Sequence, residues 1–245
     1  LVALLVLCSA LKITKNAKII AVFTFFNIEF YIYNKYMKIP TNYDNQDFPT
    51  ITTTQFLNLF DHEISTIYME TSDTRKKIIP IFLSSTSDST LNIYLDFDAW
   101  FRSYLSISEN NPRVLLFKPT QINLEDSLIS LFSWTKPKFD YLIVDSIPSF
   151  YKLINNGTEP NRASELLFYY LSSLKNFVCN ANAKMILLNL PVYKSLPKSN
   201  NKFIGMKVLD YISDTILYID TIHNKTNIHI FNDDLSVERS VNLEN

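Results

Sequence analysis

Glycine is almost absent from this chain, whose 245 residues include only Gly157 and Gly205. Average usage of about 7 % would give roughly 17 glycines in a chain of this length. Glycine is the residue that lets a backbone turn tightly around a phosphate group, because it has no Cβ and adopts positive φ readily. Neither glycine follows a plausible first strand, so the sequence excludes a glycine-rich phosphate-binding loop of ordinary form.

Composition is otherwise that of a globular protein. Hydrophobic residues make up 47 % of the chain and aromatic residues 14 %, enough for a sizeable core. The net charge of −1 gives no overall attraction to nucleic acid or to an anionic membrane. Two cysteines, Cys8 and Cys179, do not make a disulfide framework, which suits a reducing compartment.

The first 36 residues differ from the rest. They hold two apolar runs, 1–11 and 19–33, each shorter than the ~20 residues of a membrane-spanning helix. We expect the native protein to start at Met37 and residues 1–36 to be an extension; the alternative is an amino-terminal membrane anchor. We expect an irregular lead-in over 37–54 and one core domain over 55–245.

A short buried strand is the clearest motif. Residues 141–144 (YLIV) form an apolar, partly β-branched run that ends in Asp145, and Pro148 follows. Such a run is typical of a central parallel strand covered on both faces. An acidic residue at its carboxyl end lies where open α/β sheets bind ligands.

Strands and helices alternate along the remainder. This order predicts an α/β fold: a single domain with a mainly parallel central sheet flanked by helices and an antiparallel strand pair at the C-terminal edge. A polar turn is expected at 70–77 and a loop at 191–207. The expected strands are 64–69, 91–97, 113–117, 141–145, 184–190, 214–220 and 227–231, and the expected helices are 55–60, 78–83, 100–107, 124–132 and 162–178.

The order and spacing of these segments resemble the RecA-type recombinase core, in particular the eukaryotic recombinase paralogues. A strand and polar turn (IYMETSDTRKK) stand where that family has its phosphate-binding loop. The segment FDYLIVDSIPSFY is similar to the family's LLIIDSI-A-F strand, and MILLNLPVY stands where the family has TNQV. The resemblance covers roughly residues 55–235 and implies a RecA-like fold.

The phosphate-binding loop departs from the pattern G-x-x-x-x-G-K-[ST] that phosphate binding needs. Laid on residues 69–76, the resemblance puts side chains at both glycine positions and removes the hydroxyl that binds Mg²⁺. The acid that activates water is shortened to Asp98, and Leu190 replaces the glutamine after Asn189. We therefore expect no ATP hydrolysis, no cofactor and no catalytic residue, with Asp145 as a vestigial strand-end carboxylate. The degenerate loop positions are Met69, Glu70, Thr74, Arg75 and Lys76.

The loop 191–207 carries lysines and aromatic residues and no acid. Lysine neutralises phosphates without reading sequence, and aromatic rings stack on bases. The resemblance places this loop where the family has a DNA-contacting loop; the alternative is a solvated surface loop. The predicted DNA-contacting residues are Lys194, Lys198, Lys202, Lys207, Tyr193 and Phe203.

Other candidates for chemistry have structural interpretations. We interpret Asp96 and Asp98 as solvated turn residues. The three histidines lack metal-ligand spacing, and His223 and His229 are expected on a surface hairpin, so no metal site is predicted. Cys179 is interpreted as an apolar helix-end residue.

The resemblance implies a non-catalytic recombinase paralogue, similar to subunits of the fungal Shu complex. Such a protein assists homologous recombination and DNA repair in the nucleus by pairing with another paralogue, contacting the recombinase filament and binding single-stranded or forked DNA weakly. The aromatic residues near 56–60 are the expected partner surface. Two alternatives stay open: an ATPase with an unorthodox site around Glu70, Asp98 and Asp145, and a membrane-anchored protein if residues 1–36 are native.

Overall fold

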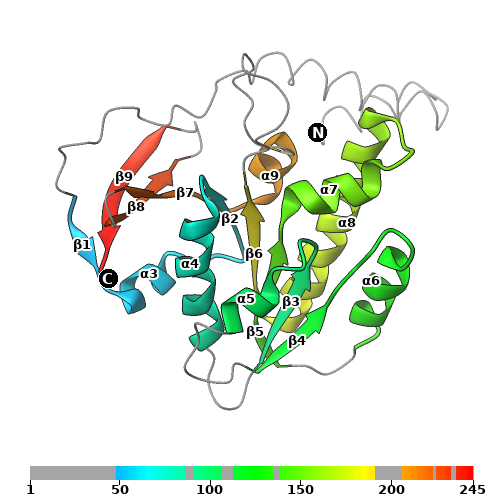
Figure 1. Ribbon diagram of the computed structural model, residues 1–245, viewed down its shortest axis with the longest axis horizontal. Coiled ribbons are helices and arrows are strands. Elements are labelled where there is room, and N and C mark those ends of the chain that lie inside the picture. Colours follow the sequence, from blue (N-terminus) through cyan, green and yellow to red (C-terminus); the bar gives the residue numbers. More distant parts are fainter. Residues whose placement is uncertain are drawn as a thin grey trace, which may run out of the picture. The chain divides into compact units, whose positions relative to one another are not determined.

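A nine-stranded sheet organises the described residues (Figure 1). The computed structural model describes residues 48–85, 91–105, 113–134, 138–190, 206–222, 225–232 and 236–244. The strand order is β1-β9-β8-β7-β2-β6-β5-β3-β4. The strands are β1 (Thr50–Ile51), β2 (Ile64–Met69), β3 (Leu91–Asp96), β4 (Val114–Phe117), β5 (Phe139–Asp145), β6 (Lys184–Asn189), β7 (Thr215–Ile222), β8 (Lys225–Phe231) and β9 (Val237–Leu243).

The six strands from β7 to β4 along the sheet are parallel to one another. β8 is antiparallel to β7, β9 is antiparallel to β8, and β1 is parallel to β9. The hairpin predicted from the sequence is therefore present, and β1 and β9 extend it. Both extensions were missed: β1 lies inside the predicted irregular lead-in, and β9 (VERSVNL) carries mostly polar residues.

Helices cover both faces of this sheet. Right-handed crossovers between parallel strands put α3, α4 and α5 on one face and α6 to α9 on the other. Figure 1 shows α4 and α5 in front of the sheet and α8 behind it. The helices are α3 (Thr53–Asn58), α4 (Ser72–Ser84), α5 (Phe101–Leu105), α6 (Leu124–Phe132), α7 (Ile147–Asn155), α8 (Pro160–Ala181) and α9 (Met206–Ile212).

The core follows the alternation of side chains along each strand. Ile67 and Met69 of β2 are fully buried in the cluster that packs under α3 and α4. Tyr68, between them, therefore points to the opposite face, where α8 buries Leu167, Leu171, Leu174 and Val178. Continuous burial along β2, β5 and β6 matches the apolar runs from which these strands were predicted.

Non-glycine residues take backbone conformations that glycine commonly fills. Asn182 ends α8 with φ 52°, in the left-handed region, where asparagine is the usual substitute for a C-terminal glycine. Ala99 has φ 59° in the turn after β3. The shortage of glycine is thus met by asparagine at one turn and by backbone strain at another.

No helix within the described residues is long and apolar enough to cross a bilayer. Residues 1–47, which include both amino-terminal apolar runs, lie outside that part of the chain. The described residues all belong to one unit, Ile39–Asn245.

Candidate functional site

The carboxyl ends of β3 and β5 bring two acidic residues side by side. Asp96 and Asp145 are register partners in these neighbouring strands. Asp145 is fully buried and Asp96 is 3 % exposed. This edge of a parallel sheet is where α/β proteins bind ligands, so the surroundings of Asp145 decide what the site can do.

The connection from β2 to α4 consists of Glu70 and Thr71 alone. Thr71 is the N-cap of α4, and its Oγ1 accepts a hydrogen bond from the backbone N–H of Thr74 at 3.2 Å. Glu70 Oε2 accepts a hydrogen bond from the Tyr218 hydroxyl at 2.8 Å. The polar turn predicted for 70–77 is therefore wrong from Ser72 onward, because a threonine cap lets the helix begin directly after the strand.

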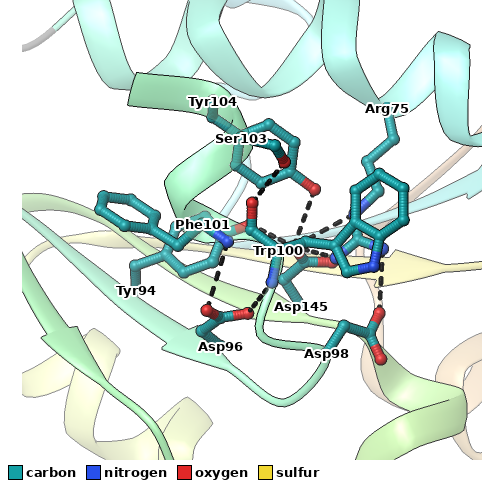
Figure 2. A network of polar contacts seen from close by, with 9 residues as sticks. All are labelled: Arg75, Tyr94, Asp96, Asp98, Trp100, Phe101, Ser103, Tyr104 and Asp145. Carbon is teal, nitrogen blue, oxygen red and sulfur yellow. Dashed lines mark hydrogen bonds and ion pairs between the residues drawn. The ribbon is translucent and has the colours of Figure 1, made fainter. Parts of the chain in front are cut away.

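Arg75, in the second turn of α4, extends to the carboxyl edge of the sheet (Figure 2). Its Nη1 donates to Asp98 Oδ2 at 2.9 Å, its Nε donates to Asp145 Oδ2 at 3.2 Å, and its Nη2 donates to the same Asp145 oxygen. Arg75 is only 2 % exposed. A guanidinium can bind two carboxylates in this way because its donors are arranged as a rigid planar fork.

Two tyrosines complete the surroundings of Asp145. The hydroxyls of Tyr94, on β3, and Tyr104, on α5, both donate to Asp145 Oδ2, the second at 3.3 Å. The other carboxylate oxygen, Oδ1, is buried and accepts no hydrogen bond from any described residue. We call Arg75, Tyr94, Asp98, Tyr104 and Asp145 the Arg75 cluster.

Aromatic rings cover the guanidinium. The Arg75 Cζ lies 5.4 Å from the centroid of the Trp100 ring and 5.7 Å from that of Tyr104. These distances fit cation–π contacts, which are strongest where water is excluded. Figure 2 shows the Trp100 ring beside the Arg75 head group. The cluster is thus closed by side chains from α4, β3, α5 and β5.

Burial controls the protonation of this cluster. Loss of solvent raises the pKa of Asp145 to about 6, although the Arg75 charge and the Tyr94 hydrogen bond act in the opposite direction. Burial by itself lowers the pKa of Arg75, but Asp145 and the other acidic groups around the guanidinium together raise it by more, so Arg75 is a permanent cation. Burial also raises the pKa of both tyrosines, which therefore remain hydrogen-bond donors. Asp145 is ionised at neutral pH and takes up a proton below about pH 6.

The turn between β3 and α5 holds Asp98 against Arg75. Asp96 accepts hydrogen bonds from the backbone N–H groups of Trp100 and Phe101, at 3.0 and 3.2 Å, and so fixes the start of α5. The side chain of Asp98 is 15 % exposed. Interpreting Asp96 and Asp98 as solvated turn residues was wrong, because one closes a helix and the other belongs to a buried ion pair.

A second, partly buried carboxylate lies on the other face of the sheet. Asp210, on α9, accepts a hydrogen bond from the Tyr68 hydroxyl at 3.3 Å. Burial raises the pKa of Asp210 to about 6. Tyr68 is fully buried, and its hydroxyl also hydrogen-bonds Asn189, the residue at the end of β6. No described cation pairs with Asp210, unlike Asp145.

Comparison with solved structures decides the fold family. The crystal structure of the RadB recombinase superposes with a TM-score of 0.51 and 18 % sequence identity, over 68 % of this chain and 79 % of that one. The chain has a RecA-like fold. A scan against protein-family models found no match. A search of curated proteins found none either.

The residues predicted to form a degenerate phosphate-binding loop lie in regular secondary structure or in the short connection before α4. Met69 is buried in the core at the end of β2, and Thr74 is buried in α4, where its hydroxyl donates to Thr221 Oγ1 at 3.1 Å. Lys76 forms an exposed ion pair with Asp73 at 3.2 Å. The predicted loop residues are thus in a strand, a short connection and a helix.

The predicted DNA-contacting residues are largely outside the described part of the chain. Residues 191–205, which carry Lys194, Lys198, Lys202, Tyr193 and Phe203, are not described. Lys207 belongs to the first turn of α9. The DNA contact therefore stays a prediction.

The partner surface expected near residues 56–60 is wrong. Phe56 and Phe60 are fully buried and pack edge-to-face at 5.0 Å between ring centroids, with Phe82 beside them. Apolar spacing alone did not distinguish a buried face from an exposed one. Among the described residues, the exposed large apolar side chains are elsewhere, at Trp100, Ile122, Ile129, Phe132, Trp134, Tyr169 and Tyr211.

Histidine and cysteine have structural roles here. His229 is fully buried, not on a hairpin surface, and its Nδ1 lies 2.8 Å from Ser240 Oγ. Cys179 Sγ donates to Glu63 Oε2 at 3.1 Å. Among the described residues no group of three or more His, Cys, Asp or Glu could hold a metal ion.

Tyr94 and Tyr104 of the Arg75 cluster, and Trp100 beside it, were not predicted from the sequence. Tyr94 stands two residues before Asp96, which places both on the same face of β3. That spacing was the available signal for Tyr94. The other two contacts depend on how α5 packs against α4, which no local pattern specifies.

Proposed function

We propose that this chain is a non-catalytic recombinase paralogue that assists homologous recombination and DNA repair by binding a partner subunit and DNA. The RecA-like fold supports this assignment. RadB, the structural neighbour, is described as a recombinase, and that description is carried to this chain as a proposal.

One observation carries the non-catalytic part. In P-loop ATPases the loop lysine binds the outer phosphates and the strand-end aspartate holds Mg²⁺. Here the residue at the lysine position, Arg75, and the strand-end Asp145 bind each other. Asp98, at the position of the water-activating acid, binds the same guanidinium. The side chains that would bind a nucleotide and its Mg²⁺ therefore form ion pairs with one another.

The connection before α4 supports the same proposal. A phosphate cradle needs several backbone N–H groups that turn inward around the phosphates. Between β2 and α4 the chain offers two residues, and the N–H groups of Thr74 and Arg75 already donate to Thr71. This geometry leaves little backbone to surround a triphosphate.

Without a nucleotide site, the protein acts through the surfaces that bind a partner subunit and DNA. We place the protein in the nucleus, paired with another recombinase paralogue in an assembly like the Shu complex. The lysines of 191–207 bind DNA phosphates without sequence preference, and Tyr193 and Phe203 stack on bases. About four phosphate contacts give weak binding, so the partner subunit extends the DNA-binding surface.

Fluorescence anisotropy with labelled single-stranded and forked DNA tests the DNA-binding part. The full chain should bind with the same Kd with and without Mg-ATP, because no nucleotide is required. Replacing Lys194, Lys198, Lys202 and Lys207 with alanine should weaken binding and flatten its salt dependence by up to about three or four in slope.

A matched variant controls for the lost charge. Alanine at Lys77, Lys118, Lys138 and Lys152, four exposed lysines in other segments, removes as much positive charge and should leave the salt slope near that of the wild type. Equal losses in both variants, or DNA binding that requires ATP, would contradict the proposal.

The ATPase alternative needs Glu70, Asp98 and Asp145 to be available. Glu70 accepts the Tyr218 hydroxyl, and the two aspartates share Arg75. These contacts weigh against that alternative.

A further inference from the structure

A pocket of about 340 Å³ opens between α6, α7 and α8. Its volume is at the lower end of the roughly 300–1,000 Å³ of typical ligand pockets. Figure 1 shows α6 and α7 beside α8, at the β4 side of the sheet. The residues that line the pocket are Gln121, Ile122, Leu124, Glu125, Asp126, Leu153, Ile154, Leu166 and Tyr170.

Buried apolar side chains form the floor of this pocket, and exposed side chains form its mouth. Leu124 and Ile154 are buried at 8 % and 6 % exposure. Ile122, at the mouth, is 95 % exposed, the most exposed large apolar side chain among the described residues. Ile122 and the buried apolar residues line the same pocket, so together they form one apolar surface that a partner can cover.

Two acids stand at the same mouth. Glu125 and Asp126 line the pocket from the first turn of α6, and both are exposed. They complement the helix dipole there. Glu125 also accepts the Tyr170 hydroxyl at 3.4 Å, and neither acid pairs with a cation among the described residues. The mouth is therefore negative and open to a basic group.

We propose that this pocket docks a segment of a partner protein that presents a large apolar side chain with Lys or Arg within two residues of it. The apolar side chain fills the floor over Leu124 and Ile154, and the basic side chain pairs with Glu125 or Asp126. A small molecule inside the pocket would leave Ile122 in water, whereas a chain segment covers both. This inference goes beyond the proposed function and does not depend on the Arg75 cluster or on DNA binding.

Selection from a random twelve-residue peptide library against the full chain tests the proposal. Enriched peptides should share an apolar residue, such as Leu, Ile, Met or Phe, with a neighbouring Lys or Arg. The best peptide should bind about tenfold more weakly to Ile122→Ser and to the double variant Glu125→Gln/Asp126→Asn, and the second loss should shrink at high salt.

Two matched variants serve as controls. Ile129→Ser removes an exposed isoleucine of the same helix, and Glu165→Gln removes an exposed acid of α8; neither residue lines the pocket. Both should bind the peptide as the wild type does, and circular dichroism should show that every variant is folded.

Three outcomes would overturn the proposal: no enriched peptide, enriched peptides without a basic bias, or equal binding by pocket and control variants. Hexylammonium, titrated alone, tests the small-molecule occupant. Binding of this ion as tight as that of the best peptide, with no effect of Ile122→Ser, would also overturn the proposal in favour of a small-molecule site.

Discussion

Asp145 and Asp210 lie on opposite faces of one sheet, and their carboxylates are hydrogen-bonded in different ways. Asp145 is fully buried, and its Oδ2 accepts hydrogen bonds from Arg75, Tyr94 and Tyr104. Asp210 is partly exposed and receives the Tyr68 hydroxyl. Burial raises both pKa values to about 6. The Arg75 charge thus does not fully offset the effect of burial on the pKa of Asp145.

The largest expected difference concerns the cation. Arg75→Met leaves Asp145 buried without its counter-ion, and breaking a buried pair this way costs about 3–5 kcal/mol in free energy of unfolding. Lys76→Met, one residue along α4, removes a cation whose ion pair is exposed, and should cost less than about 1 kcal/mol. Urea denaturation of both variants measures the contrast. Equal losses in free energy of unfolding would show that Arg75 does not form a stabilising buried ion pair with Asp145.

The raised pKa of the carboxyl on each face should make the free energy of unfolding depend on pH. Because the folded pKa of Asp145 is about 6 and the unfolded value is near 4, the folded state binds more protons between these pH values. The contribution of Asp145 to the free energy of unfolding is therefore present at low pH and is lost as the pH rises through 6. The free energy falls by at most about 1.4 kcal/mol per pH unit.

Asp145→Asn lacks this slope, so its deficit relative to the wild type should shrink between pH 4 and pH 7. Asp210→Asn should change the slope in the same direction, without the additional cost of leaving a cation unpaired. Unfolding free energies at four pH values measure both. A deficit of Asp145→Asn that grows with pH would mean that Arg75 lowers the pKa of Asp145.

Hydroxyl removal gives a smaller contrast. Tyr94→Phe removes a donor from a fully buried carboxylate, which should cost about 1.5–3 kcal/mol, as for hydrogen bonds to charged groups. Tyr68→Phe removes the 3.3 Å hydrogen bond to the partly exposed Asp210 together with the contact to Asn189, and should cost about 1 kcal/mol. Thermal unfolding of the two variants compares them, and a reversed order would place the more tightly held carboxylate on the α9 face.

The turn that carries Asp98 offers the smallest effect. Ala99 has φ 59°, a conformation that costs a residue with a Cβ roughly 1–2 kcal/mol. Ala99→Gly should therefore stabilise the protein by up to about 1 kcal/mol after the entropy of the unfolded chain is counted. Differential scanning calorimetry measures this gain; a loss would show that the left-handed conformation carries no strain.

The central strands were predictable because a strand that is buried on both faces consists of consecutive apolar residues, such as YLIV before Asp145. α4 was cut short in the prediction because ETSDTRKK is polar, although Thr71 is a good N-cap and Asp73 suits a first turn. α7 was missed because Pro148 suggests only the end of the preceding strand, whereas proline also fits well in the first turn of a helix.

The sequence indicated which residues belong to the candidate site, but not which of them contact one another. Asp145 at a strand end and Arg75 at the loop lysine position were both singled out from the sequence. Their pairing joins residues 70 positions apart, and it depends on α4 starting at Ser72, so no local pattern could indicate it. The buried state of Phe56 and Phe60 likewise depends on Phe82.

Isothermal titration of the purified full chain with ATP and Mg²⁺ tests most directly whether Arg75 and Asp145 have replaced a nucleotide site. We predict no saturable heat up to about 1 mM ATP and no phosphate release above background. Saturable binding with a micromolar Kd would contradict it, since a triphosphate could then be held only if the Arg75 cluster opened.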